Sequence, residues 1–261
     1  MRRKLLSITI VIAVMLIAVP LVQAITFGQP DGEDHPNVGA MIVEDRDGVF
    51  LYCSGTLIAP DVFLTASHCT IAAAFYDADP HDVWVTFDPV YDENATLHRG
   101  TYDINPNYGH DSHDLHDVAV IILDEPITDI DPAQLPPAGL LDDMKADHEL
   151  KGHKFVTVGY GRLRDDKTKG PQAMGDAGER YMAEQTFQAL KPFWLQLSMN
   201  PSTGNGGTCY GDSGGPHFLG DSDMVVSLTV TGDAWCRATD VTYRLDTESA
   251  RAYLSQFVNL P

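Results

Sequence analysis

Basic residues are scarce in this 261-residue sequence: 17 Lys and Arg face 37 Asp and Glu, and the net charge is −20 at pH 7. A surface of this charge repels the phosphates of DNA and RNA, so we expect no nucleic-acid partner. We interpret the acidic excess as a coat that keeps the protein soluble. Apolar residues make up 44% of the chain, which is an ordinary share for a globular protein.

Long hydrophobic runs are also scarce, and the one long run occupies residues 5–19. It follows basic residues 2–4 and precedes V-Q-A at residues 22–24, which is typical of a cleavage site. The run falls short of the ~20 apolar residues of a membrane span, and Pro20 interrupts it. We predict a secretory signal peptide over residues 1–24, with an uncleaved membrane anchor as the alternative.

Cleavage of this signal would release a secreted protein, extracellular or periplasmic, that keeps no contact with the membrane. It would remove three basic residues and no acidic ones, so the net charge would fall from −20 to about −23. The acidic character therefore belongs to the mature chain.

Cysteine is limited to four residues, and no two of them form a C-x-x-C pair. In an exported chain, four cysteines suggest two disulfides, for which three pairings are possible. A zinc site with four cysteine ligands is the alternative, but the spacing that favours it is missing. Cys53 and Cys69 flank a segment with a histidine, and Cys209 and Cys236 flank a segment with a serine.

Helical periodicity is rare, and short strand-like runs recur between Gly, Pro, Asn and Asp residues. This pattern favours an all-β barrel or sandwich. A proline-rich stretch at residues 126–137 is typical of a linker. We expect surface loops over residues 162–192, and an amphipathic helix over residues 247–258 that is capped by Asp246 or Thr247. The predicted strands lie at residues 50–53, 55–58, 62–64, 83–87, 118–123, 155–161, 193–199, 216–219, 224–230 and 241–245.

The segment G-G-T-C-Y-G-D-S-G-G-P at residues 206–216 places Ser213 between glycines. A serine hydroxyl is a poor nucleophile near neutral pH and needs a base within hydrogen-bond reach. His68, in T-A-S-H-C, is a candidate base, and Asp117 is a candidate carboxylate to orient it. Asp114 is an alternative orienting acid, but Asp117 directly precedes an apolar strand and is preferred.

Three segments resemble the trypsin/chymotrypsin family of serine peptidases: T-A-x-H-C, D-[IV]-A-[VL] and G-D-S-G-G-P, in the same chain order. The resemblance extends from about residue 25 to the C-terminus. It implies an all-β fold of two packed six-stranded antiparallel β-barrels with a C-terminal helix. The first barrel would occupy residues 25–135 and the second residues 136–261. It also implies the disulfides Cys53–Cys69 and Cys209–Cys236.

The resemblance further implies that Ser213 attacks a scissile carbonyl while His68 takes its proton and Asp117 orients the imidazole. The backbone N–H groups of Gly211 and Ser213 would form the oxyanion hole. We therefore expect a secreted, monomeric serine endopeptidase that cleaves protein or peptide substrates through an acyl-enzyme, without a cofactor or a metal. The alternatives are an inactive protease-like binding module and an esterase with the same triad.

The specificity pocket departs from the family pattern, in which an aspartate six residues before the nucleophile recognises Arg or Lys. Gly207 occupies that position here, followed by Thr208, and a neutral base favours an apolar or small uncharged side chain. The far wall, around Gly232 and Asp240, departs from the family's S-W-G and G-V-Y patterns. Asp240 could restore a negative charge, or Val241 could fill part of the pocket.

In the family, a free N-terminal Ile or Val pairs with the aspartate before the nucleophile, here Asp212. A buried carboxylate is costly unless it is paired, so this contact shapes the oxyanion loop. Signal cleavage after Ala24 would expose Ile25 and make a separate activation step unnecessary. The alternative is that Ile25 is an ordinary strand residue.

Three histidines, His110, His113 and His116, alternate with aspartates and could ligate a divalent metal. Their spacing differs from the i, i+4 helical pair of zinc peptidases. We therefore interpret this segment as a solvated polar loop.

Overall fold

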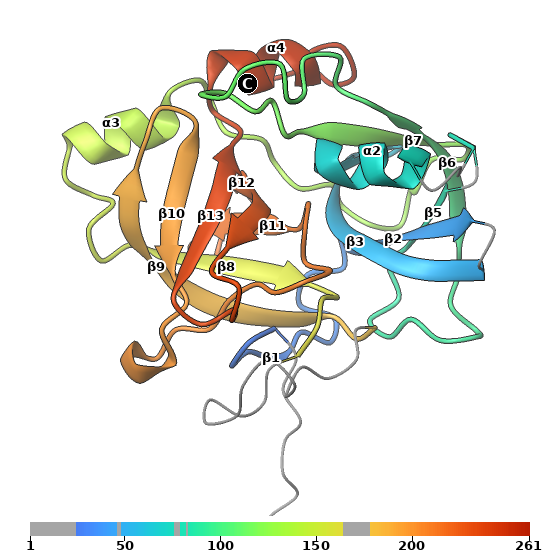
Figure 1. Cartoon of the computed structure of the whole chain (residues 1–261), viewed down its shortest axis with the longest axis horizontal. Coiled ribbons are helices and arrows are strands. Elements are labelled where there is room, and N and C mark those ends of the chain that lie inside the picture. The colour runs from blue at the N-terminus through green and yellow to red at the C-terminus, as the bar shows by residue number, and fades with distance from the viewer. Residues whose placement is uncertain (1–24, 46–47, 76–78, 82, 164–177) are drawn as a thin grey trace, which may run out of the picture.

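Two antiparallel β-barrels lie side by side in the computed structural model, one on each side of Figure 1. The structure describes residues 25–45, 48–75, 79–81, 83–163 and 178–261. The predicted signal peptide, residues 1–24, lies outside the described residues. Within the described part of the chain, no helix is long and apolar enough to span a bilayer.

The first barrel is a closed sheet in the order β2-β3-β4-β7-β6-β5. Small residues let its strands approach closely: a Cβ on Gly55 would lie 2.3 Å from the carbonyl oxygen of Leu64. Phe63, Ile121 and other fully buried apolar side chains fill its interior. Its strands are β2 (Val38–Asp45), β3 (Gly48–Ala59), β4 (Val62–Thr65), β5 (Val83–Thr86), β6 (His98–Asp103) and β7 (Ala119–Leu123).

The second barrel closes because β8 pairs with both β9 and β11, at the two ends of the order β9-β10-β13-β12-β11-β8. The short strand β1 (Gln29–Pro30) adds to β9. The predicted fold of two six-stranded antiparallel barrels is therefore confirmed. The strands are β8 (Lys154–Gly159), β9 (Tyr181–Leu190), β10 (Trp194–Ser198), β11 (Pro216–Leu219), β12 (Val225–Gly232) and β13 (Thr239–Arg244).

One expectation was wrong, because residues 181–190 form strand β9 instead of a surface loop. Tyr181, Ala183 and Gln185 are buried at alternate positions, as a half-buried strand requires. Ala183 is small and Gln185 is polar, so the sequence does not show the alternation of apolar residues that predicts a strand. The rest of the predicted loop, at residues 164–177, lies outside the described residues.

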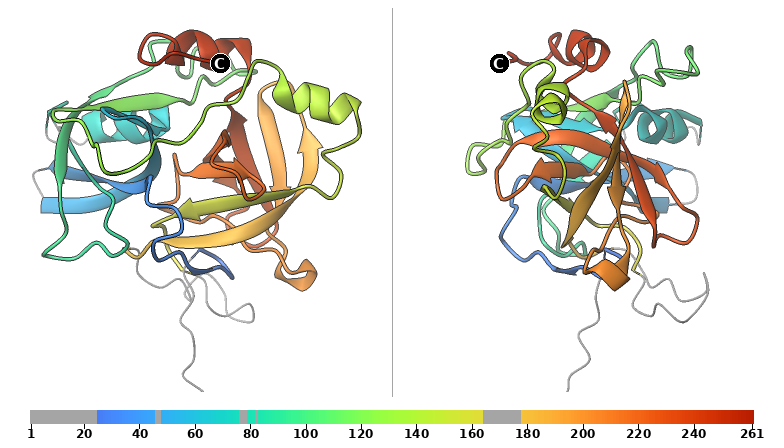
Figure 2. Two further views of the ribbon diagram at one scale, coloured as in Figure 1. Left: turned by 180° about the vertical axis from the view of Figure 1, so that it is seen from behind. Right: turned by 90° about the vertical axis from the view of Figure 1, so that its left-hand side faces the viewer.

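The helices lie outside the barrels, and α4 (Glu248–Leu254) crosses their top in Figures 1 and 2. The other helical segments are α2 (Ser67–Phe75), α3 (Leu140–Ala146) and the 3-10 turn η2 (Pro201–Thr203). Of the two expected caps of α4, Thr247 is the N-cap, and its hydroxyl accepts a hydrogen bond from the N–H of Ala250 at 3.3 Å. The helix ends at Leu254, four residues earlier than predicted.

The two barrels share a continuous apolar core. Val38, Leu64 and Val120 of the first barrel belong to the same buried cluster as Val158 and Phe218 of the second. Burial of this surface stabilises the packing of one barrel against the other. The contact face thus holds β4 and α2 in a fixed position relative to the segment that precedes β11.

Candidate active site

His68 is positioned by the junction between β4 and α2. Its backbone N–H donates to Asp117 Oδ1 at 2.9 Å, and its Nδ1 lies 2.9 Å from Asp117 Oδ2. The hydroxyl of the preceding residue, Ser67, donates to the carbonyl of Val118 at 2.8 Å and ties the start of α2 to β7. Because Asp117 is only 1% exposed, its charge acts on the imidazole with little screening by water.

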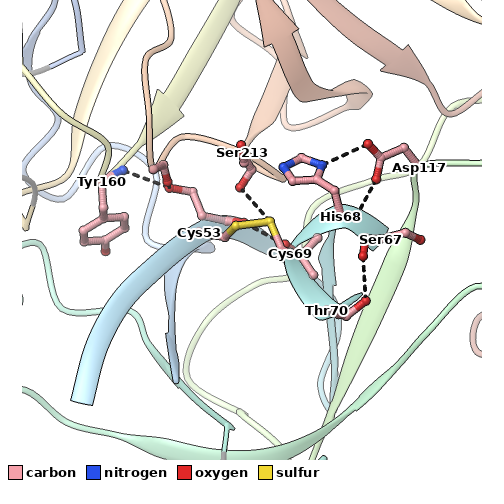
Figure 3. The surroundings of a disulfide bond; sticks show 11 residues. Cys53, Ser67, His68, Cys69, Thr70, Asp117, Tyr160 and Ser213 are labelled. Atoms are coloured by element: carbon pink, nitrogen blue, oxygen red, sulfur yellow. Dashed lines mark hydrogen bonds and ion pairs between the residues drawn. A yellow bond between two sulfur atoms is a disulfide. The ribbon is translucent and has the colours of Figure 1, made fainter. Parts of the chain in front are cut away.

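Ser213 lies on the other side of the imidazole from Asp117 in Figure 3. The carbonyl of Ser213 accepts a hydrogen bond from Ser54 N–H at 2.9 Å and lies 3.8 Å from Cys69 Sγ. A ring nitrogen of His68 lies within 4.8 Å of the sulfurs of Cys53 and Cys69. The disulfide thus connects the serine segment to the histidine, and the three triad candidates come together from three separate segments.

Both cysteine pairs match the pairing that the family resemblance implies. Cys53–Cys69 joins β3 to α2, and Cys209–Cys236 joins the nucleophile segment to the loop after β12. With both sulfurs of the first pair in a disulfide, no thiolate is available to a metal at His68. Among the described residues, this is the one cluster with metal-ligand spacing, and it does not include the three histidines of residues 110–116.

Asp114, the alternative orienting acid, faces a different partner. Its Oδ1 accepts hydrogen bonds from Tyr243 Oη at 2.7 Å and from the N–H of His116 at 3.0 Å. His116 adopts a left-handed backbone conformation, with φ of 53°, directly before Asp117. This turn directs the two carboxylates to different neighbours, so that Asp114 joins the loop to β13 and Asp117 holds the histidine.

The backbone around the serine is a glycine-dependent turn. Gly211 has φ of 100°, a conformation that L residues with a side chain rarely adopt, and Gly214 has φ of 78°. The carbonyl of Gly211 accepts a hydrogen bond from Ser54 Oγ at 3.0 Å. Gly215 N–H donates to the carbonyl of Asp212 at 2.9 Å and closes the turn around Ser213.

Asp212 is completely buried beneath this turn. Its Oδ1 accepts from Gly161 N–H at 2.7 Å, and its Oδ2 accepts from Cys209 N–H at 2.8 Å. Burial raises the pKa of Asp212 to about 7, against the lowering effect of these two hydrogen bonds. Among the described residues no cationic side chain pairs with this carboxylate to favour its ionised form.

Ile25 is fully buried and packs against Tyr181 and Ala183. The next residue, Thr26, accepts a hydrogen bond from the N–H of Gly207 at 2.9 Å, close in sequence to the nucleophile. The start of the predicted mature chain therefore lies against the serine-bearing segment. The pairing of a new N-terminus at Ile25 with Asp212 stays a prediction.

A cavity of about 220 Å³ adjoins Ser213 and includes Thr208, Thr229, Thr231 and Gly232 in its lining. Of the four predicted pocket residues, Thr208 and Gly232 line the cavity. A larger cavity, of about 930 Å³, lies between α3 and α4 and contains none of the triad candidates. The positions of the triad candidates, and not the size of a cavity, therefore identify the candidate active site.

The other two predicted pocket residues, Gly207 and Asp240, lie behind the lining. A Cβ on Gly207 would stand 2.2 Å from Met199 Cγ, so the methionine occupies the space beside this glycine. Asp240 is fully buried, and its Oδ2 accepts hydrogen bonds from Thr208 Oγ1 at 2.7 Å and from Gln185 Nε2 at 2.8 Å. The carboxylate is thus one side chain away from the cavity.

Sequence reasoning missed three side chains around this pocket, namely Gln185, Met199 and His217. Each comes from a strand or strand end whose pattern carries no sign of a site, and none belongs to a recognisable motif. Only the closure of the second barrel brings them together.

Comparison with known proteins assigns this chain to a family. The family model described as Trypsin matches residues 28–250, and the chain belongs to this family. Similar curated proteins include a trypsin of Saccharopolyspora erythraea, 28% identical over 212 residues (78% of this chain, 85% of the relative), and brachyurin of Leptuca pugilator, 27% identical over 224 residues (81% and 90%). Kallikrein-5 of Homo sapiens is 24% identical over 192 residues, 71% of this chain and 60% of the relative.

A solved structure titled as HL collagenase, at 1.7 Å resolution, shares the fold. Its TM-score is 0.65 at 18% sequence identity, and the match covers 88% of this chain and 96% of that one. The class of protein is therefore a trypsin-like serine endopeptidase, a hydrolase, as the family and its named members establish.

Proposed function

We propose that this chain is a secreted serine endopeptidase in which Ser213, His68 and Asp117 form the catalytic triad. The observation that carries the proposal is the position of His68. One buried carboxylate holds it through its backbone N–H and Nδ1, and the sulfur of the adjoining Cys69 lies 3.8 Å from the carbonyl oxygen of Ser213. With Nδ1 paired to Asp117, the proton of the neutral ring resides there. Nε2 is then the acceptor for the serine proton.

In the proposed reaction, Ser213 Oγ forms a bond to the scissile carbonyl carbon as its proton moves to His68 Nε2. The buried Asp117 stabilises the imidazolium that results. The C–N bond then breaks, the amine leaves with the proton, and an acyl-enzyme remains. Water attacks this ester with His68 again as the base, and the serine is regenerated.

The backbone N–H groups of Gly211 and Ser213 are the proposed donors to the developing oxyanion. The positive φ of Gly211 turns the peptide in the way that a close approach of backbone to ligand requires. Loss of one such donor typically lowers turnover about 10²–10³-fold. A free ammonium at Ile25, paired with the buried Asp212, would keep this loop in its reactive conformation.

Secretion, a monomeric state and protein or peptide substrates belong to the same proposal. The two disulfides suit an oxidising compartment. The substrate peptide would lie across the junction of the two barrels, because the residues proposed as the triad come from both. The side chain before the scissile bond would enter the cavity beside Thr208 and Gly232.

The test is labelling of the signal-free protein with a fluorophosphonate probe, beside Ser213→Ala. Labelling of the parent alone is the expected result, since only an activated serine reacts with the phosphonate. An unlabelled parent whose N-terminus is Ile25 would contradict the proposal and favour the inactive binding module. Turnover of a simple ester without any turnover of the matched peptide amide would favour the esterase.

A further inference from the structure

A cluster of polar side chains occupies the interior of the second barrel, directly behind the cavity beside Ser213. It includes Gln185 from β9, His217 from β11, Thr229 from β12 and Asp240 from β13. Gln185, His217 and Asp240 have no exposed surface. His217 Nε2 lies 3.0 Å from Thr229 Oγ1 and 3.6 Å from Asp240 Oδ2.

The cluster is incompletely satisfied within the protein. Asp240 Oδ1, Gln185 Oε1 and His217 Nδ1 are buried without a hydrogen-bond partner among the described residues. Such groups are rare in folded proteins because they destabilise the native state, and each calls for an explanation. Replacing buried ionic groups with well-packed apolar residues is often neutral or stabilising, so packing alone does not account for them.

Two threonines connect the cluster to the cavity. Thr208 lines the cavity and donates its one hydroxyl proton to Asp240 Oδ2, so its lone pairs remain as acceptors for a bound side chain. Thr229 lines the same cavity and contacts His217. A change of charge at the buried pair therefore reaches a ligand through a single intervening hydroxyl.

The charge of the cluster depends on few groups. Of the elements that pack against His217, β8 contributes Thr157 and β12 contributes Ser227 at the paired positions, and neither titrates near neutral pH. Gln185 of β9 is neutral. Among the described residues, the charged neighbour of His217 is Asp240, and the carboxylate of Asp240 also influences the ionisation of Asp212.

We propose that His217 is a positioning residue for substrate specificity, which sets the charge behind the pocket through Asp240. With a neutral ring, the carboxylate of Asp240 is uncompensated and the pocket favours a cationic side chain before the scissile bond. With a protonated ring, the pair is neutral and that preference is lost. This inference rests on the proposed peptidase function.

The ionisation of His217 is consistent with this role. Burial lowers the pKa of the imidazole below its usual value, and the nearby Asp240 raises it only in part. The ring is therefore neutral at pH 7 and gains its proton as the pH falls. The preference for a cation should accordingly be highest at neutral to alkaline pH and decline in acid.

The test compares two fluorogenic tripeptide amides with neutral flanking residues, one ending in arginine and one in citrulline. The two side chains have nearly the same shape and differ in charge, and arginine stays charged at every pH used. The ratio of their kcat/KM values at one pH removes the titration of His68, which both substrates share. We expect this ratio to rise at least about tenfold from the most acidic pH at which the protein stays folded to pH 8.

Two variants assign the effect to its residues. His217→Gln keeps a neutral donor but cannot titrate, so the ratio should stay high and no longer depend on pH. Asp240→Asn should give a low ratio at every pH. Phosphonate labelling of Ser213 counts the folded, competent sites in each preparation. If a variant does not fold, the pH profile of the parent still tests the inference.

A flat ratio in the parent would overturn the inference while leaving the peptidase function intact. A ratio that still varies with pH in His217→Gln would overturn it as well, because another group would then be responsible. If the parent cleaves neither amide although Ser213 is labelled, the inference fails and the peptidase function stands. If Ser213 is not labelled either, the proposed function fails and the inference fails with it.

Discussion

The two barrels share one architecture but differ in what lies inside them. The first is filled by apolar side chains such as Met41, Leu57 and Val85, and Asp117, the carboxylate that contacts His68, lies just before β7 begins. The second contains a buried histidine and a buried aspartate on neighbouring strands next to the pocket. The comparison shows that the barrel beside His68 is packed with apolar side chains, whereas the barrel beside the cavity contains buried ionisable groups.

The same contrast is seen in the ways the two carboxylates are partnered. Asp117 is paired with His68 and lies in the first half of the chain. Asp212, in the second half, has backbone donors alone among the described residues, and its pKa is raised to about 7. An unpaired buried carboxylate disfavours its own ionisation. Asp212 is thus buried without the side-chain partner that Asp117 has in His68.

The largest effect should come from breaking the pair in the first barrel. Asp117→Asn should lower kcat/KM for a peptide amide by about 10³–10⁴-fold, a size known for other enzymes with this triad, because the ring would adopt the wrong tautomer. Asp114→Asn is the matched control, since Asp114 contacts Tyr243 and not His68. Steady-state kinetics on both variants measure the difference. Equal losses would show that the orienting carboxylate has been assigned to the wrong residue.

The next effect concerns Asp212 and the N-terminus. The pKa of this group is raised in the folded state, so the folded state binds more protons and stability falls as pH rises from about 4 to about 7. For a chain that starts at Ala24, the free energy of unfolding should fall by roughly 4 kcal/mol across this window. A chain that starts at Ile25 should lose much less, because its ammonium pairs with the carboxylate.

Urea unfolding of the two chains at a series of pH values measures this difference. Asp212→Asn in the chain that starts at Ala24 is the control, and it should remove the slope because the amide does not titrate. Identical profiles for the two starts would argue against pairing of Ile25 with Asp212.

The smallest predicted effect concerns packing behind the pocket in the second barrel. Gly207→Ala should lower the free energy of unfolding by about 1–3 kcal/mol, because the new methyl group overlaps the side chain of Met199. Met199→Ala in the same chain should recover part of this loss. A double-mutant cycle on thermal unfolding gives the coupling between the two sites. Additive effects would show that Met199 does not confine Gly207.

Local sequence patterns predicted much of the fold. The strands with apolar runs, such as the one that begins after Asp117, were recognised because burial on both faces requires such runs. Strand β6 (His98–Asp103), with the sequence H-R-G-T-Y-D, and helix α3, with L-L-D-D-M-K-A, were not predicted. Their side chains alternate too weakly in polarity for a pattern to show, and long-range pairing and packing determine their structure.

The sequence by itself determined the class of fold and the identity of the candidate site residues. The serine turn, the histidine segment and the aspartate are each encoded within a few neighbouring residues, so a reader of the chain can name them. Only the tertiary structure decided which further groups lie behind the pocket. Gln185, Met199 and His217 are far apart in the chain and meet only when the second barrel closes, because barrel closure brings together residues from different strands irrespective of their separation in sequence.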